Sequence, residues 1–143
     1  MRILLVVADF YTEIAEMLLE GAVAHIEAHQ HHYDVIRVPG ALEIPIAIAM
    51  ASSSHTYDGY VALGCVIRGE TTHYDYVCGE SARGLMELGV REHLAIGNGI
   101  LTVESREQAI ERAHPSRKNK GAGAVQACLA LAEIAATYRK KVA

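Results

Sequence analysis

The sequence has too few cysteines, in the wrong pattern, for a disulfide scaffold or a zinc module. Cys65, Cys78 and Cys128 are the only three, and no two of them form a CxxC pair. An odd number of widely spaced cysteines argues against structural disulfides and against a zinc knuckle. This usage favours a reducing compartment, so we expect a cytoplasmic protein without a metal site.

Long charged blocks and long apolar runs are also missing. The chain carries 13 Lys and Arg against 17 Asp and Glu, and its basic clusters lie only at 117–120 and 139–141. This distribution argues against a nucleic-acid interface but admits a small phosphorylated substrate. No uninterrupted apolar run approaches the roughly 18 residues that span a bilayer, so we expect no membrane segment. The opening MRILLVVADF lacks a small-residue cleavage site and is interpreted as a buried strand, not a signal peptide.

Large aromatic side chains are scarce as well. There is no tryptophan, and Phe10 is the only phenylalanine. It follows the first apolar run, where its ring could stack on a flat ligand. The alternative is a core residue, or a hydrophobic contact with the helix that follows.

What the 143 residues do contain is a regular alternation of strand-like and helix-like segments. Continuous apolar runs predict strands buried on both faces, and apolar residues at helical spacing predict helices. The predicted strands are 3–8, 33–38, 60–67 and 95–103. The predicted helices are 11–29, 43–52, 75–93, 105–113 and 121–141. Thr12 and Ser105 are candidate N-caps. The alternation predicts an α/β fold whose parallel sheet is covered on both faces, in one domain over residues 1–143.

The loop GETTH, at 69–73, is the strongest local motif. In a parallel sheet the loops after the strands meet at one edge, and ligands bind there. Gly69 allows close approach of the backbone, and the amides and Thr71 could hold an anion at the start of a helix. His73 could transfer protons near neutral pH. The alternative is an ordinary capped helix with an exposed histidine.

Two further segments carry polar groups that could belong to the site. Glu43 follows the turn Pro39–Gly40, where it could accept hydrogen bonds from substrate hydroxyls, or be placed there simply because the helix dipole favours a carboxylate. Arg112 and Lys120 flank a break between helices and could bind phosphate, although most such clusters are solvated loops. The histidine tract at 29–32 lacks a carboxylate partner and is interpreted as a solvated loop.

Four stretches together resemble one enzyme family. They are VPGALEIP, ALGCVIRGETTHYDYVC, NGILTVESREQAIERA and NKGAGA, in that order along the chain. The sequence is similar to the 6,7-dimethyl-8-ribityllumazine synthases over nearly its whole length. The resemblance implies a flavodoxin-like, three-layer α/β/α sandwich with a four-stranded parallel sheet. It also implies condensation of 5-amino-6-(D-ribitylamino)uracil with 3,4-dihydroxy-2-butanone 4-phosphate, without a metal or an organic cofactor.

The resemblance also assigns site residues. Those implied at the pyrimidine and ribityl chain are Phe10, Ala41, Leu42, Glu43, Cys65, Val66, Ile67, Asn98 and Lys120. Those implied at the phosphate are Glu70, Thr71 and Arg112, and His73 is implied as the proton donor. It further implies a homo-oligomer, a pentamer or a sixty-subunit icosahedral shell, with sites between adjacent subunits. Because the chain starts almost at its first strand, we expect it to lack the N-terminal segment of many members, which favours the pentamer.

The chain also departs from the family pattern. Asp9 stands where many members have arginine, Asn98 where many have an aromatic residue, and Gly123 where a carboxylate often follows the NKG motif. These departures would favour an alternative function, a weakly catalytic paralogue that carries lumazine or flavin. A flavodoxin-like module that binds phosphate or mononucleotides is a second alternative, which leaves VPGALEIP and His73 without a role.

Overall fold

The chain folds around a four-stranded parallel sheet in the order β2-β1-β3-β4. The computed structural model describes residues 1–142, with side chains through residue 140. The strands are β1 Arg2–Ala8, β2 His32–Val38, β3 Gly59–Ile67 and β4 Ile96–Val103. The helices are α1 Thr12–Ala28, α2 Glu43–Ser52, α3 His73–Glu92, α4 Arg106–Ala113 and α5 Lys120–Val142. The predicted α/β/α sandwich with four parallel strands is confirmed.

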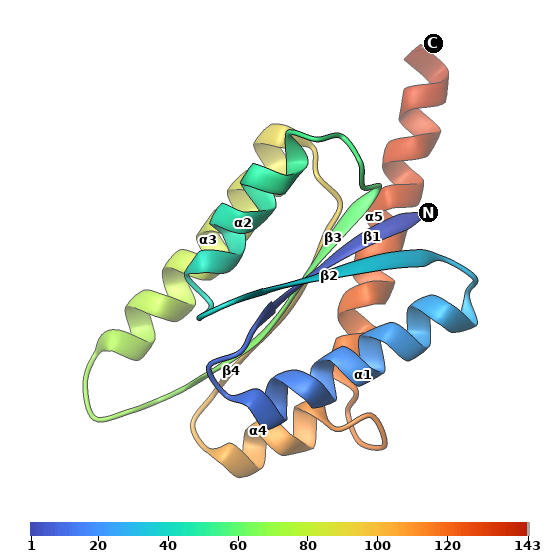
Figure 1. The fold of residues 1–143 in the computed structure, drawn as a ribbon. Helices are drawn as coiled ribbons and strands as arrows, with labels where there is room; N and C mark the ends of the chain where they lie inside the picture. The colour runs from blue at the N-terminus through green and yellow to red at the C-terminus, as the bar shows by residue number, and fades with distance from the viewer. Residues whose placement is uncertain (143) are drawn as a thin grey trace.

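The helices form two layers, one on each face of the sheet (Figure 1). β1 lies in the middle, and its apolar run is buried from Ile3 to Ala8. Because side chains alternate along a strand, Ile3 and Leu5 pack into the core under α1 and α5, whereas Leu4 and Val6 pack against α2. A strand with helices on both faces must therefore be apolar at every position, which is the pattern in the sequence.

Helix starts are where the sequence prediction and the structure differ. Ser105 is the N-cap of α4, and its side chain accepts a hydrogen bond from the Gln108 amide, as predicted. Thr12 is not a cap: it is the first helical residue, Tyr11 occupies the N-cap, and the Thr12 hydroxyl donates to the carbonyl of Asp9. The helix α3 begins at His73, two residues earlier than predicted.

Two helices of the same layer, α1 and α5, approach each other unusually closely. A Cβ atom built on Gly121 would lie 2.9 Å from the carbonyl carbon of Leu18, and closer still to its oxygen. Gly21 is equally confined, by the side chain of Asn119. Asn119 has a positive φ of 47°, and its buried Oδ1 has no hydrogen-bond partner among the described residues. The glycines on the two helices therefore allow the first turn of α5 to pack directly against α1.

By length and composition alone, α5 could cross a membrane over Lys120–Lys140. Core helices of soluble proteins pass the same test, and 39% of the 18-residue window that meets it is buried. Val125, Cys128 and Ala132 form its buried face against the sheet. We therefore take α5 as a core helix.

Candidate functional site

A cavity of about 310 Å³ opens at the carboxyl ends of β1 and β3, between the starts of α2 and α3. Most of the residues expected at the site line it: Phe10, Ala41, Leu42, Glu43, Cys65, Val66, Ile67, Thr71 and His73. Residues at and after the ends of three strands, β1, β2 and β3, meet here because a parallel sheet brings its carboxyl ends to one edge. Its volume is within the range of small-molecule sites.

One wall of the cavity is flat and apolar. Phe10 follows β1 and keeps 73% of its surface exposed, and its ring meets that of Tyr11 edge to face at 4.9 Å. The end of β3 contributes Cys65 as far as Ile67. An exposed aromatic ring beside an apolar strand end can stack on a planar ligand.

The start of α2 adds a carboxylate to this wall. Glu43 is the first helical residue, and its amide donates to the carbonyl of Gly40 across the turn. A Cβ on Gly40 would lie 3.7 Å from the Glu43 carboxylate. The carboxylate therefore lies over the turn at the mouth of the cavity, where it can accept hydrogen bonds from ligand hydroxyls.

The start of α3 forms the polar side of the cavity. The His73 amide donates to the Thr71 hydroxyl at 3.3 Å. The N-cap residue Thr72 makes no side-chain capping bond. Amides at a helix start attract anions, and the helix dipole adds to that attraction. This end of the cavity therefore suits a phosphate, with an imidazole beside it.

Cys65 belongs to the wall of the cavity and is not a nucleophile. Burial raises the pKa of its thiol to about 11, with a smaller opposing effect of Arg106. The thiol is therefore protonated at neutral pH, and a protonated thiol is a weak nucleophile.

Four expected site residues do not line the cavity of their own chain: Glu70, Asn98, Arg112 and Lys120. Glu70 lies in the exposed loop before α3. Asn98 is exposed on the edge strand β4, where its side chain accepts from the Ile100 amide at 3.0 Å. Arg112 donates to the carbonyl of Gln108 on α4, and Lys120 begins α5 on the other helix layer.

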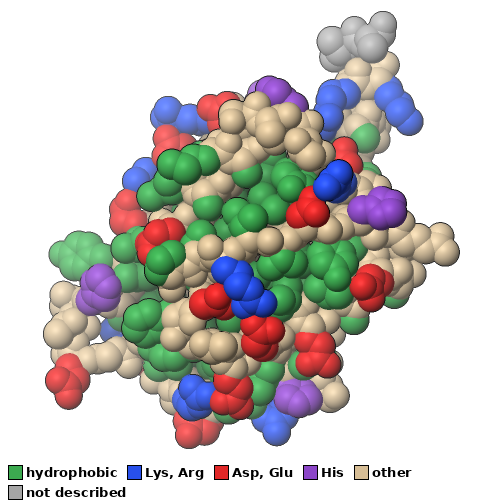
Figure 2. Space-filling model, in the orientation of Figure 1, with side chains coloured by type: hydrophobic (Ala, Val, Ile, Leu, Met, Phe, Trp, Pro, Cys, Tyr) green, Lys and Arg blue, Asp and Glu red, His purple; other side chains and the backbone are tan. Residues whose placement is uncertain are grey.

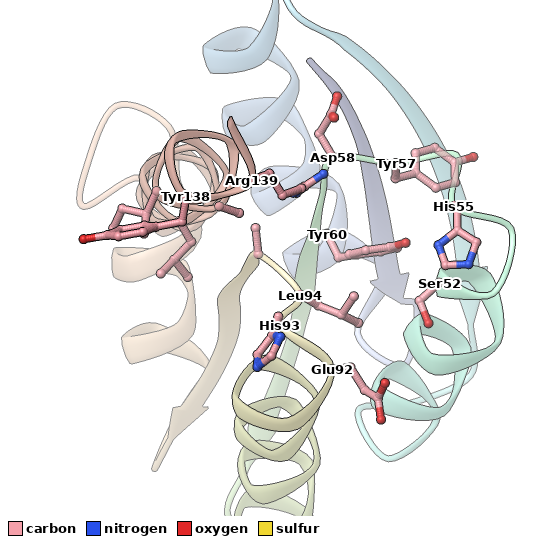
Figure 3. A pocket seen from close by; sticks show the side chains of 15 residues that line it. Ser52, His55, Tyr57, Asp58, Tyr60, Glu92, His93, Leu94, Tyr138 and Arg139 are labelled. Atoms are coloured by element: carbon pink, nitrogen blue, oxygen red, sulfur yellow. The ribbon is translucent and has the colours of Figure 1, made fainter. Parts of the chain in front are cut away.

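A larger hollow of about 970 Å³ lies at the opposite end of the sheet, where β3 and β4 begin. His55 and Tyr57 lie on one side of it, and Tyr138 of α5 on the other (Figure 3). Ligands of parallel α/β sheets bind outside the carboxyl ends of the strands. The smaller cavity is therefore the candidate active site.

Comparison with known proteins decides the family. The family model for 6,7-dimethyl-8-ribityllumazine synthase matches residues 1–136. The chain belongs to this family. A lumazine synthase of Erythrobacter litoralis is 53% identical over 133 residues, which cover 93% of this chain and 94% of that protein. One of Bartonella tribocorum is 56% identical over 131 residues, 91% of this chain and 87% of that protein.

Membership of the lumazine synthase family removes the alternative of a mononucleotide-binding module. The departure at Asp9 has a structural explanation, because this carboxylate pairs with Arg37 of β2 at 2.8 Å. Gly123 faces open space, with nothing within 4 Å of a Cβ built on it. Neither residue blocks the cavity. Nothing among the described residues favours the carrier alternative.

The cavity also includes Gly69 of the predicted anion-binding loop, and residues that were not predicted at the site. These are Tyr11, Gly40, Tyr74 and Val77. Val77 lies one helical turn after His73, so the helical period could have indicated it. In the tract at 29–32, His29 and Gln30 are exposed, His31 lies 3.2 Å from the N-terminal amine, and His32 is the first residue of β2 rather than part of a loop.

Proposed function

We propose that this chain is a 6,7-dimethyl-8-ribityllumazine synthase, which condenses 5-amino-6-(D-ribitylamino)uracil with 3,4-dihydroxy-2-butanone 4-phosphate and releases phosphate and water. The observation that carries the proposal is the cavity itself. It joins an exposed aromatic ring, a carboxylate and an uncapped helix start with a histidine. These groups match a planar pyrimidine, a polyol chain and a phosphate.

The reaction is one in which positioning supplies much of the rate. The amine of the uracil condenses with the ketone to an imine and expels water, and phosphate then leaves by elimination. The ribitylamino nitrogen adds to the remaining carbonyl, and loss of a second water closes the ring. Phe10 would hold the pyrimidine by stacking, and Glu43 would accept from the ribityl hydroxyls. The amides at the start of α3, with Thr71, would hold the phosphate. His73 would transfer protons between the two substrates.

We further propose that the site is completed by a second copy of the chain. Arg112 and Lys120 are cations of the kind that bind phosphate, yet they lie outside the cavity of their own chain. Two separate surfaces carry exposed apolar side chains. One, on α2 and α3, comprises Ile46, Met50, Tyr76, Met86 and Val90. The other, on α5, comprises Leu131, Ile134 and Tyr138.

These two surfaces support a head-to-tail assembly. Apolar side chains are prominent over the α2 and α3 layer in Figure 2, whereas α5 lies in the other layer (Figure 1). Contact between two different surfaces of identical chains generates a ring when the rotation closes. We propose a pentamer, located in the cytoplasm, in which Asn98, Arg112 and Lys120 of one subunit complete the cavity of the next.

Mixing two impaired variants tests both proposals. His73→Gln damages the cavity, whereas Arg112→Gln leaves the cavity intact and damages the contribution to a neighbour. In mixed rings, about a quarter of the interfaces would join an intact cavity to an intact arginine. Lumazine formation, followed by absorbance, should therefore recover to about that fraction of the parent rate above the spontaneous reaction.

The matched control mixes His73→Gln with Glu43→Gln. Both substitutions damage the same cavity, so no interface in the mixed ring is complete and no recovery is expected. An inactive parent would contradict the proposed reaction. An active parent without recovery in the first mixture would contradict the shared site alone.

A further inference from the structure

We propose that Arg68 is a positioning residue for the start of α3, which carries the proton-transfer group of the site. This role rests on the proposed function. Arg68 directly follows β3, and its amide donates to the carbonyl of Val103 on β4 at 3.0 Å. Its backbone therefore belongs to the sheet, whereas its side chain reaches the helix.

The guanidinium contacts three residues on two elements. Its Nε donates to Glu104, after β4, at 2.8 Å. One terminal nitrogen lies 3.6 Å from the Asp75 carboxylate in the first turn of α3. Its Cζ lies 4.3 Å from the centre of the Tyr74 ring. A planar cation over an aromatic face is attracted by the ring, so one side chain connects the end of the sheet to two consecutive residues of α3.

His73 directly precedes those two residues, and little else holds it. Residues 69–73 are all exposed, and a Cβ on Gly69 would have nothing within 4 Å. The hydrogen bonds within the loop are local: the His73 amide donates to the Thr71 hydroxyl, and the Asp75 amide donates to the Thr72 carbonyl at 3.0 Å. The contacts that relate this loop to the sheet include the guanidinium, the packing of Tyr74 and Val77 at the cavity wall, and a side-chain hydrogen bond between Tyr74 and Thr102 of β4.

These contacts should affect geometry more than stability. The side chains of Arg68, Asp75 and Glu104 are 42%, 60% and 58% exposed, and exposed ion pairs contribute little to folding. A reacting group displaced by about 1 Å can, however, cost on the order of a hundred-fold in rate. We therefore expect Arg68 to affect turnover at nearly unchanged stability.

The test compares Arg68→Met with Arg68→Lys and with a control far from the cavity. Arg2→Met is the matched control, because Arg2 is an exposed arginine at the start of β1 whose guanidinium pairs with Asp34 at 2.8 Å and lies 5.8 Å from the centre of the Tyr57 ring. Arg68→Met should lower kcat by about ten-fold, with KM for the aminouracil changed less than about two-fold. Arg68→Lys keeps the charge without the planar stack and should recover part of kcat, whereas Arg2→Met should match the parent.

Amide hydrogen exchange gives a readout that does not depend on activity. Peptides covering 69–75 should exchange faster in Arg68→Met, and those covering β1 should not. Unchanged exchange, or a kcat equal to that of an active parent, would overturn the role of Arg68 and leave the proposed function standing. An inactive parent would overturn the function and, with it, the catalytic consequence of this residue.

Discussion

Gly121→Ala should destabilise the protein, whereas Gly123→Ala, two residues further along α5, should stabilise it. Ordinary van der Waals contact begins at 3.4 Å, but the new methyl group at Gly121 would lie 2.9 Å from the carbonyl carbon of Leu18 and 3.2 Å from the Ala22 amide nitrogen. Backbone atoms of α1 cannot rotate away as a side chain would. The two helices must therefore separate by half an ångström or more.

The expected loss of stability in Gly121→Ala is the difference between two opposing effects. Overpacking of this kind costs about 1–3 kcal/mol, and the upper end applies because two backbones must move. Replacing glycine by alanine in a helix returns up to about 1 kcal/mol, less at the second residue of a helix. The net loss for Gly121→Ala is therefore about 2 kcal/mol. At about 3–4 °C per kcal/mol for a chain of this size, Tm should fall by about 6–8 °C.

The control substitution places the same methyl group where nothing lies within 4 Å. Gly123→Ala should then show only the gain in helix propensity, a rise in Tm of about 2–3 °C. Both variants are compared with the parent by thermal unfolding followed by circular dichroism, at one protein concentration because association contributes to Tm. If Gly121→Ala unfolds within about 1 °C of the parent, the close approach of α1 and α5 is wrong.

Three other predictions concern ionisable groups. His73→Gln should slow turnover by about ten-fold or more and leave the assembly unchanged in sedimentation; an unchanged rate removes His73 from the mechanism. Burial raises the pKa of both Cys65 and Cys78, but Cys78 is only half-buried, so iodoacetamide should label Cys78 first by peptide mass spectrometry. Burial and nearby positive charges lower the pKa of His25 and His31. The unfolded chain then binds these protons more tightly, so denaturation midpoints should fall as the pH drops below about 6.5. His31→Gln should lessen that fall, and an equal pH slope in this variant would contradict it.

The four parallel strands followed from the sequence, most directly β1 and β3, because burial on both faces leaves a continuous apolar run. The start of α3 did not, because its N-cap residue Thr72 makes no side-chain capping bond. Tyr11, the N-cap of α1, also makes no side-chain capping bond. The sequence rule for N-caps depends on a bond from the N-cap side chain to a backbone amide of the first turn. Where the side chain does cap, at Ser105, the prediction was correct.

The candidate site likewise contains residues that the sequence could place and residues that it could not. Glu43, Cys65 and His73 come together because each lies at or after the carboxyl end of a strand of one parallel sheet, which sequence order alone can indicate. Arg112 and Lys120 follow the last strand onto the other helix layer, so no argument from strand ends could bring them to the cavity. The contact of Arg68 with Tyr74 is likewise tertiary, because spacing along the chain says nothing about where a guanidinium points.

The separation of the cations from the cavity has an arithmetic consequence for the proposed assembly. A single chain has a cavity without its cations and a pair of cations without a cavity. An open row of copies completes a site at every junction, yet always leaves one half-site unused at each end. Only a closed ring has as many complete sites as subunits. When the two ends of a row meet, their unused half-sites combine into one further complete site.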